Sequence, residues 1–322
     1  MKFSILIPAY KRTYLKDCID SVLNQTFSQF EIIILNDASP ESIDSVVRMF
    51  NDPRIKYYEN VHNIGAINVV DNWNKCLEYA TGDYVICIGD DDRLLPNCLE
   101  EYSKLICKNP GKAVYHAWTQ IIDENNDVVS MQEARPEIEG VFSLMRERLS
   151  NHREQFIGDF LFETDRLKEE GGFFKLPLAW GSDDITVFRA AKRNGIANSQ
   201  IPLFQYRVNS QTISRQGDIN IKWNAQQQYF AWIQSILDDY NIEGSSPEAV
   251  YFRLIKEKWA FTKMKKQTNT IAKDILSGNA AKKTIFWLIN PRKYDVSLSL
   301  RIFAIITALK SILSGANKTN HF

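Results

Sequence analysis

The sequence feature that most constrains the fold is a short apolar run at residues 84–88 that passes directly into acidic residues. A strand with so little polar character must be buried on both faces, as a strand inside a parallel sheet is. Asp90, Asp91 and Asp92 begin where this strand should leave the sheet. Ligands of open α/β sheets collect at the carboxyl edge, so the acidic loop predicts a ligand site there.

The first hundred residues alternate short β-branched runs with amphipathic stretches. The predicted elements are, in order, strand 3–10, helix 14–25, strand 30–39, helix 41–50, strand 54–58 and helix 67–80. This alternation is typical of parallel strands joined by helical crossovers. The sequence therefore predicts an α/β fold, with a Rossmann-like, mostly parallel sheet flanked by helices.

Each acidic position also has an ordinary structural explanation. Asp37 is of the residue type that begins helices and turns. The loop at 90–92 precedes a predicted helix, and Asp183 with Asp184 would suit the first turn of another, where the helix dipole favours carboxylates. Taken one at a time, the structural explanation is favoured at each position.

The three consecutive aspartates are harder to explain by structure alone. Their charges repel one another at one strand end, and a divalent cation would offset that repulsion. Oxygen ligands suit Mg²⁺ or Mn²⁺, particularly where a diphosphate supplies further oxygens. The sequence has no GxGxxG after its first strand and no GxxxxGK[ST], so neither the dinucleotide fingerprint nor the P-loop explains the pattern.

Five blocks, taken in order, resemble the family 2 glycosyltransferases with the GT-A fold. They are SILIPAYKR (4–12), SVLNQTFSQFEIIILNDAS (21–39), NIG (63–65), ATGDYVICIGDDDRLLP (80–96) and WGSDDITVFRAAKRNG (180–195). The resemblance covers roughly residues 1–215. It implies an inverting enzyme that transfers a sugar from a nucleoside-diphosphate sugar, with a UDP-sugar favoured. The implied acceptor is the hydroxyl of a saccharide or lipid-linked saccharide, in the synthesis of capsule, O-antigen or exopolysaccharide.

The resemblance assigns the nucleotide-sugar contacts to residues near the carboxyl ends of the first two predicted strands. Pro8, Ala9 and Tyr10 would lie against the base and ribose, and Asp37 would contact the base. An acceptor contact is expected from Trp180, since its aromatic face offers a large apolar area to a sugar ring. Core packing is expected for most of the other aromatic residues of that region, which include Trp118, Phe160, Phe162, Phe173 and Phe174.

The same resemblance identifies Asp90-Asp91-Asp92 as the family's DxD-type motif. Asp90 would help to bind the nucleotide sugar, Asp91 would contact the ribose or diphosphate, and Asp92 would bind the Mn²⁺ or Mg²⁺ ion. Asp183 would be the catalytic base. In an inverting transfer a carboxylate takes the proton of the acceptor hydroxyl, while a cation neutralises the leaving diphosphate. No protein nucleophile is needed, and none is predicted.

Three positions depart from the family pattern. Gly89 stands where the first acid of the DxD stretch is usual, Ser182 replaces the common glutamate before the base, and Asn209 stands where many relatives have histidine. These departures leave open which residues besides Asp92 hold the metal.

The chain is expected to end in a helical, basic region. Beyond residue 215 the pattern is helical only, which divides the chain into a catalytic domain at 1–215 and a C-terminal region at 216–322. Counting Lys and Arg against Asp and Glu gives 14 against 3 over residues 251–322, which leaves 25 of the 39 cations and 36 of the 39 acids for residues 1–250. Amphipathic helices with this charge suit an anionic membrane surface, or they pack on the enzyme; both remain open.

The expected location is the cytoplasm, with possible peripheral contact at the anionic inner face of the plasma membrane. The five cysteines form no CxxC pair, and the N-terminus lacks the apolar core of a signal peptide. The longest apolar-rich stretch of the tail, residues 302–309, is much shorter than the roughly 20 residues that cross a bilayer. The tail carries no recognisable nucleic-acid-binding module, so no nucleic-acid partner is expected.

Two other functions compete with sugar transfer. One is a non-catalytic sugar-nucleotide-binding or scaffold protein of the same fold. The other is a nucleotidyltransferase, which also uses Mg²⁺ and an α/β sheet, although the first loop IPAYKR does not resemble the glycine-rich, basic loop of those enzymes. Released nucleoside diphosphate would indicate sugar transfer, and released pyrophosphate would indicate nucleotidyl transfer.

Overall fold

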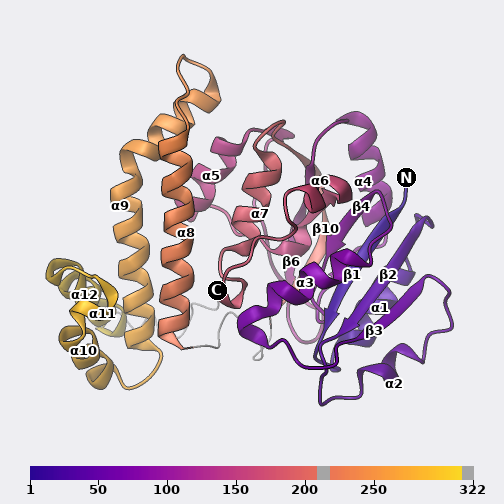
Figure 1. Ribbon diagram of the computed structural model, residues 1–322, viewed down its shortest axis with the longest axis horizontal. Coiled ribbons are helices and arrows are strands. Elements are labelled where there is room, and N and C mark those ends of the chain that lie inside the picture. Colours follow the sequence, from indigo (N-terminus) through magenta and orange to yellow (C-terminus); the bar gives the residue numbers. More distant parts are fainter. Residues whose placement is uncertain (209–217, 314–322) are drawn as a thin grey trace. The chain divides into compact units, whose positions relative to one another are not determined.

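The computed structural model describes residues 1–208 and 218–313, apart from the side chains of residues 291, 292 and 313. Within these ranges ten strands form one sheet. The strands are β1 (Phe3–Ala9), β2 (Phe30–Asn36), β3 (Ile55–Glu59), β4 (Tyr84–Cys87), β5 (Arg93–Leu94), β6 (Val114–Ile122), β7 (Val128–Met131), β8 (Ile138–Glu139), β9 (Phe160–Glu163) and β10 (Ile196–Arg207). Their main order is β3-β2-β1-β4-β9-β6-β10-β5, with β7 on β6 and β8 on β10 (Figure 1).

Most of the long strands run in one direction. β1 pairs in parallel with β2 and β4, β2 with β3, and β10 with β6. β9 is antiparallel to both β4 and β6, so it joins two parallel groups in the middle of the sheet. The predicted α/β fold with a mostly parallel sheet is confirmed, and the carboxyl ends of β1, β2, β4, β6 and β10 share one edge.

Helices cover both faces of the sheet. The main core packs α1 (Leu15–Leu23), α2 (Ile43–Val47) and α4 (Cys98–Lys108) on alternate residues of β1 and β2, such as Ile5, Ile7, Ile32 and Ile34. α3 (Val69–Glu78) packs on β1 and β2 from the other side, and α7 (Ser182–Ala191) packs on β6. The remaining elements of this part are η1 (Ala66–Asn68), α5 (Val141–Leu149), η2 (Ile157–Asp159), α6 (Thr164–Glu169) and η3 (Pro177–Ala179).

The predicted C-terminal helices are α8 (Ile219–Asp239), α9 (Pro247–Leu276), α10 (Ala280–Ile289), α11 (Pro291–Tyr294) and α12 (Leu298–Leu313). Compactness divides the chain into a unit of Met1–Tyr229 with Ile242–Tyr251 and a unit of Phe230–Asn241 with Phe252–Phe322. The proposed boundary at 215/216 falls at residues outside the described ranges and stays a prediction. In the described part of the chain, no helix combines the length and apolar character that a membrane crossing requires.

Candidate active site

The sheet brings the predicted nucleotide residues to one edge. Ala9 and Asn36 are partners in the β1–β2 register, and the backbone N–H of Asp37 donates to the carbonyl of Ala9 at 2.9 Å. The backbone N–H groups of Tyr10 and Lys11 both donate to one Asp90 oxygen, each at 2.7 Å. The loops after β1, β2 and β4 therefore meet, as parallel strands require.

Asp37 organises the loop that follows β3. Its buried carboxylate accepts hydrogen bonds from the Asn60 side chain at 2.8 Å and from the backbone N–H groups of Ile64 at 2.8 Å and Gly65 at 3.2 Å. Gly65 has φ +81°, a conformation that glycine adopts without steric penalty. The NIG block is thus a loop wrapped around one carboxylate, and contact between Asp37 and a base stays a prediction.

The three residues predicted to bind the nucleotide at the end of β1 differ in what they can offer a ligand. The side chain of Ala9 is buried in the core, so only its backbone can face the edge. Pro8 is partly buried, and Tyr10 is exposed. Asp90 holds this segment by accepting the two backbone hydrogen bonds described above. Burial of Asp90, together with the neighbouring charge of Asp91, raises the pKa of the Asp90 carboxyl to about 7.

Asp91 and Asp92 occupy different environments. The Asp92 side chain is buried and accepts hydrogen bonds from the backbone N–H groups of Gly89 at 3.2 Å and Arg207 at 3.0 Å. Burial raises the pKa of Asp92, and the charge of Asp91 raises it further. The Asp91 side chain is 18% exposed, with Lys11 Nζ 3.9 Å from one of its oxygens. The metal role of Asp92 stays a prediction, and Asp91 is the more accessible carboxylate.

The carboxylates of the acidic loop suit a cation that takes most of its ligands from other molecules. No group of three or more His, Cys, Asp or Glu side chains suited to a metal ion occurs within residues 1–208 and 218–313. Burial raises the pKa values of Asp90 and Asp92, and the adjacent charge of Asp91 raises them further, so the carboxylates of this loop repel one another. Mg²⁺ commonly binds one or two protein carboxylates and completes its shell with phosphate and water oxygens, so the loop is compatible with such an ion.

Gly89, one of the departures from the family pattern, has a steric explanation. A Cβ at this position would lie 2.8 Å from Asp91 Oδ1 and 2.9 Å from Asp92 Oδ2. Both distances are shorter than the contacts that Cβ atoms make in proteins. Glycine leaves room for both carboxylates to fold back over the strand end, where the backbone N–H of residue 89 donates to Asp92.

We expect Gly89→Ala to destabilise the protein by about 1–3 kcal/mol, because the added methyl forces the carboxylates off their hydrogen bonds. Urea unfolding followed by circular dichroism measures this change. The matched control is Gly278→Ala, where the nearest atom to an added Cβ is Lys283 Cε at 3.4 Å and little change is expected. Equal stability of both variants and the wild type would contradict the steric argument.

Arg207, at the end of β10, fixes the acidic loop and was not identified from the sequence. Its guanidinium is almost fully buried, donates to the carbonyls of Asp91 at 2.8 Å and Asp123 at 3.0 Å, and pairs with Asp17 at 2.8 Å. It also lies 4.3 Å from the centre of the Tyr14 ring. The segment YRVNSQTIS (206–214) contains this arginine, but its burial and its partners lie in distant parts of the chain and leave no local signal in the sequence. Asn209 of the same segment lies outside the described residues.

The paired acids at the start of α7 have separate roles. Asp184 is fully engaged: it accepts hydrogen bonds from Arg148 Nε at 2.7 Å, Gln155 at 2.6 Å and the Tyr229 hydroxyl at 3.0 Å. Asp183 is partly exposed, and in the described part of the chain no other side chain donates a hydrogen bond to it. Desolvation by the surrounding protein, together with the charge of Asp184, raises the pKa of Asp183 to about 7. Asp184 therefore holds the structure, whereas Asp183 stays partly exposed, and its role as the catalytic base stays a prediction.

The segment before Asp183 has an unusual backbone. Leu178 and Ala179 have φ values of +59° and +54°, and Gly181 has φ +89°. Such left-handed conformations in residues other than glycine are costly and concentrate at functional sites. Ser182, the second departure from the family pattern, stabilises the segment by accepting a hydrogen bond from the backbone N–H of Leu176 at 3.0 Å.

This segment packs close to the loop that Asp37 holds. η3 contacts both η1 and α3, and η1 directly follows the loop held by Asp37. Trp180 is 40% exposed, with Lys222 Nζ 5.2 Å from the centre of its ring. Phe160, Phe162 and Phe173 are fully buried instead, in the core. Trp180 is thus accessible beside the predicted base, and its acceptor role stays a prediction.

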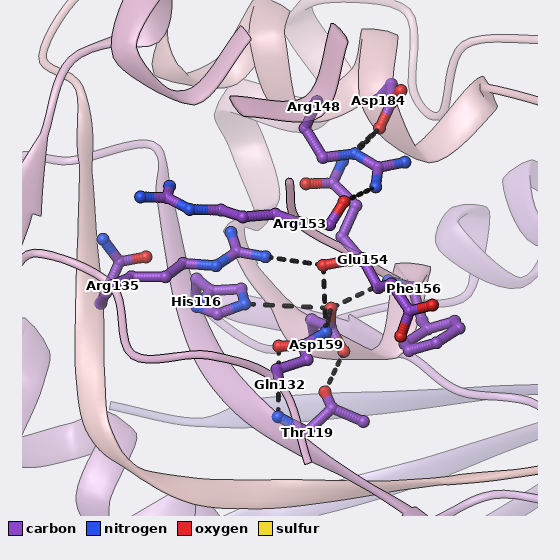
Figure 2. Close-up of polar contacts among 12 residues, drawn as sticks. His116, Thr119, Gln132, Arg135, Arg148, Arg153, Glu154, Phe156, Asp159 and Asp184 are labelled. Atoms are coloured by element: carbon purple, nitrogen blue, oxygen red, sulfur yellow. Dashed lines mark hydrogen bonds and ion pairs between the residues drawn. The ribbon is translucent and has the colours of Figure 1, made fainter. Parts of the chain in front are cut away.

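A buried polar network supports α5, η2 and α7 (Figure 2). Asp159 lies at its centre, accepting hydrogen bonds from Thr119, from Gln132 at 2.8 Å and from the backbone N–H of Phe156 at 2.8 Å. Burial raises the pKa of Asp159 to about 6 and lowers that of the neighbouring His116 well below its usual range. A cavity of about 240 Å³ beside the network is lined by Met131, Gln132, Glu133, Arg135, His152, Arg153 and Glu154.

Comparison with solved structures defines the fold as GT-A. The structure superposes on residues 1–349 of TarS from S. aureus in complex with UDP-GlcNAc with a TM-score of 0.68, covering 98% of this chain and 92% of that one at 16% identity. The glycosyl transferase family 2 model matches residues 4–167, just over half of the 322 residues. The chain belongs to glycosyl transferase family 2.

Curated relatives share the N-terminal part of this sequence. The putative colanic acid biosynthesis glycosyl transferase WcaA of Escherichia coli K12 is 39% identical over 102 residues, which cover 31% of this chain and 36% of the relative. The E. coli UDP-Glc:alpha-D-GlcNAc-diphosphoundecaprenol beta-1,3-glucosyltransferase WfgD is 31% identical over 126 residues, covering 39% and 48%. A Campylobacter jejuni GalNAc(5)-diNAcBac-PP-undecaprenol beta-1,3-glucosyltransferase is 37% identical over 101 residues, covering 30% and 32%. The match spans less than half of each relative.

Proposed function

We propose that this protein is an inverting glycosyltransferase that moves a sugar from a UDP-sugar to a hydroxyl of a saccharide or lipid-linked saccharide, in the synthesis of a bacterial surface polysaccharide. The observation that carries the proposal is the contrast at the start of α7, where Asp184 is fully hydrogen-bonded and Asp183 is not. If this acidic pair only stabilised the fold, Asp184 alone would be sufficient, because it accepts the hydrogen bonds. A transferase needs one that can receive a proton.

The relatives support the class of substrate. Two are named as glucosyltransferases acting on diphosphoundecaprenol-linked sugars, and one as a colanic acid biosynthesis transferase. The similar TarS structure holds UDP-GlcNAc. We therefore extend UDP-sugars to this chain as donors and lipid-linked saccharides as acceptors.

In the proposed reaction Asp183 accepts the proton of the acceptor hydroxyl as its oxygen attacks the anomeric carbon. The bond from that carbon to the diphosphate oxygen breaks on the opposite face, which inverts the configuration and releases the nucleoside diphosphate. Bound Mn²⁺ or Mg²⁺ would supply neutralising charge at the diphosphate. Asp91 and Asp92 would hold the ion, with Asp91 in the more accessible position. Asp90 holds the Tyr10–Lys11 backbone by two hydrogen bonds, and in the proposed complex this backbone would face the nucleotide.

Donor binding can be tested with a panel of UDP-, GDP- and dTDP-sugars, each with Mn²⁺ or with EDTA. The correct donor should raise the melting temperature in Mn²⁺, because a ligand that binds only the native state stabilises it. Asp91→Asn and Asp92→Asn should each reduce this metal-dependent shift. Stabilisation of the same size in EDTA would contradict the metal role.

The reaction products separate the competing functions. Incubation of the identified donor with acceptor or water should release nucleoside diphosphate. Pyrophosphate would indicate nucleotidyl transfer. Donor binding without any release, with acceptors extracted from a polysaccharide-producing cell present, would indicate a non-catalytic sugar-nucleotide-binding protein.

A further inference from the structure

The last helix presents a regular apolar stripe to solvent. Leu298, Ile302, Ile306, Leu309 and Ile312 of α12 follow one another at spacings of three or four residues, which places them on one side of the helix. They are between 42% and 57% exposed. Surface helices of globular proteins usually turn such a stripe toward the core, so an outward stripe marks an interaction site.

The orientation of α12 is held by contacts on its opposite side. Ala304 and Ala308 are buried, and the buried Arg301 donates to the carbonyls of Trp287 at 3.4 Å and Leu288 at 2.9 Å. Trp287 is itself fully buried and donates from Nε1 to Asp274 at 2.9 Å. The helix has therefore already used its small-residue face for packing, and the large apolar residues remain outside.

The neighbouring helix repeats this arrangement. α10 packs on α12 and buries Trp287, while Ile285, Leu288 and Ile289 stay exposed, Ile289 at 70%. Figure 1 shows α10, α11 and α12 gathered as one group beyond α9. We call the exposed side chains of the two helices the apolar face; its members are Ile285, Leu288, Ile289, Leu298, Ile302, Phe303, Ile306, Leu309 and Ile312.

Cations accompany the apolar face. Residues 280–313 contain Lys282, Lys283, Arg292, Lys293, Arg301 and Lys310, and Asp295 as the one acidic residue. Lys282, Lys293 and Lys310 are exposed, whereas Lys283 is paired with Asp274 at 2.7 Å. Large apolar residues with lysines beside them are typical of helices that lie in the interfacial layer of a membrane.

We infer that the apolar face docks on the surface of a bilayer containing anionic lipid, with α10 and α12 lying in its plane. At 10 and 16 residues the helices extend about 15 and 24 Å, short of the roughly 30 Å hydrocarbon core. Anionic headgroups complement the exposed lysines. A two-fold dimer through the same face would instead bring like charges together, because each copy presents the same patch. The inference concerns a surface outside the proposed catalytic site and does not depend on catalysis.

The test is flotation of the full chain with phosphatidylcholine vesicles, with and without phosphatidylglycerol. We expect flotation with the anionic vesicles, and about tenfold weaker binding for Phe303→Ser/Ile306→Ser/Leu309→Ser and for Lys282→Glu/Lys293→Glu/Lys310→Glu. The matched control is Met49→Ser/Val128→Ser/Val129→Ser, which removes three exposed apolar side chains elsewhere. It should float like the wild type. Circular dichroism establishes that each variant is folded.

Three outcomes would overturn the inference. They are no flotation of the wild type, equal flotation of the serine variant and its control, and a wild-type dimer in light scattering that the serine variant converts to a monomer. The last result would identify a second copy of the chain as the occupant. Donor-dependent thermal stabilisation, measured on the same proteins, reports on the proposed function separately.

Discussion

Asp183→Asn should lower kcat by about 10²–10⁴-fold, the range that general-base catalysis contributes. The substitution keeps the shape of the side chain and removes its ability to accept a proton. Because no other side chain in the described residues donates to Asp183, folding should change little. Donor affinity should be retained, and nucleoside diphosphate release under saturating donor and acceptor measures the loss.

A matched control is Asp165→Asn, an exposed aspartate in the first turn of α6. It should retain full activity. Asp184→Asn differs from both, since it disturbs the hydrogen bonds to Arg148, Gln155 and Tyr229 and should lower the melting temperature. Unchanged turnover in Asp183→Asn would remove the catalytic assignment.

The raised pKa of Asp183 predicts a pH dependence of the same reaction. The base form dominates above about pH 7, so wild-type kcat should fall by about tenfold per pH unit below it.

The contribution of Asp183 to the stability of the protein should change with pH in the opposite sense. A carboxyl with a raised pKa binds more protons in the native state than in the unfolded state, so its contribution decreases as pH rises from the unfolded value of 3.8 toward about 7.

Arg207→Ala should destabilise the protein by about 3–5 kcal/mol, the range for removing one partner from a buried charged network. The substitution leaves the carbonyls of Asp91 and Asp123 without their guanidinium donors and removes the nearer of the two arginines that pair with Asp17. Guanidinium chloride unfolding measures the change. Because the acidic loop loses its anchor, metal-dependent donor binding should weaken as well.

Two further variants test this explanation. Arg207→Lys keeps the charge but cannot reproduce three directed contacts, so it should recover only part of the stability. Arg193→Ala, at an exposed position just after α7, should stay within about 0.5 kcal/mol of the wild type. Similar stability of Arg207→Ala and Arg193→Ala would show that Arg207 does not fix the loop.

Several features could be predicted from local patterns. The apolar run at 84–88 and the alternating elements before it correctly indicated parallel strands, because burial on both faces leaves a continuous apolar signature. The order of blocks indicated the family, which the match over residues 4–167 confirms. β9 was missed, since four residues of a central antiparallel strand do not differ in pattern from other short apolar runs.

The amino-acid sequence by itself determined the fold class, the family and the positions of the acidic loops, because these depend on residue type and on spacing along the chain. Only the tertiary structure decided which carboxylates are buried among hydrogen-bond donors and which are more exposed. Asp184 differs from Asp183 because residues of α5, α8 and the loop before η2 donate hydrogen bonds to it. Asp92 differs from Asp91 because the backbone N–H at the end of β10 donates a hydrogen bond to it. Adjacent residues of one type acquire different roles when distant segments donate hydrogen bonds to one and leave the other accessible.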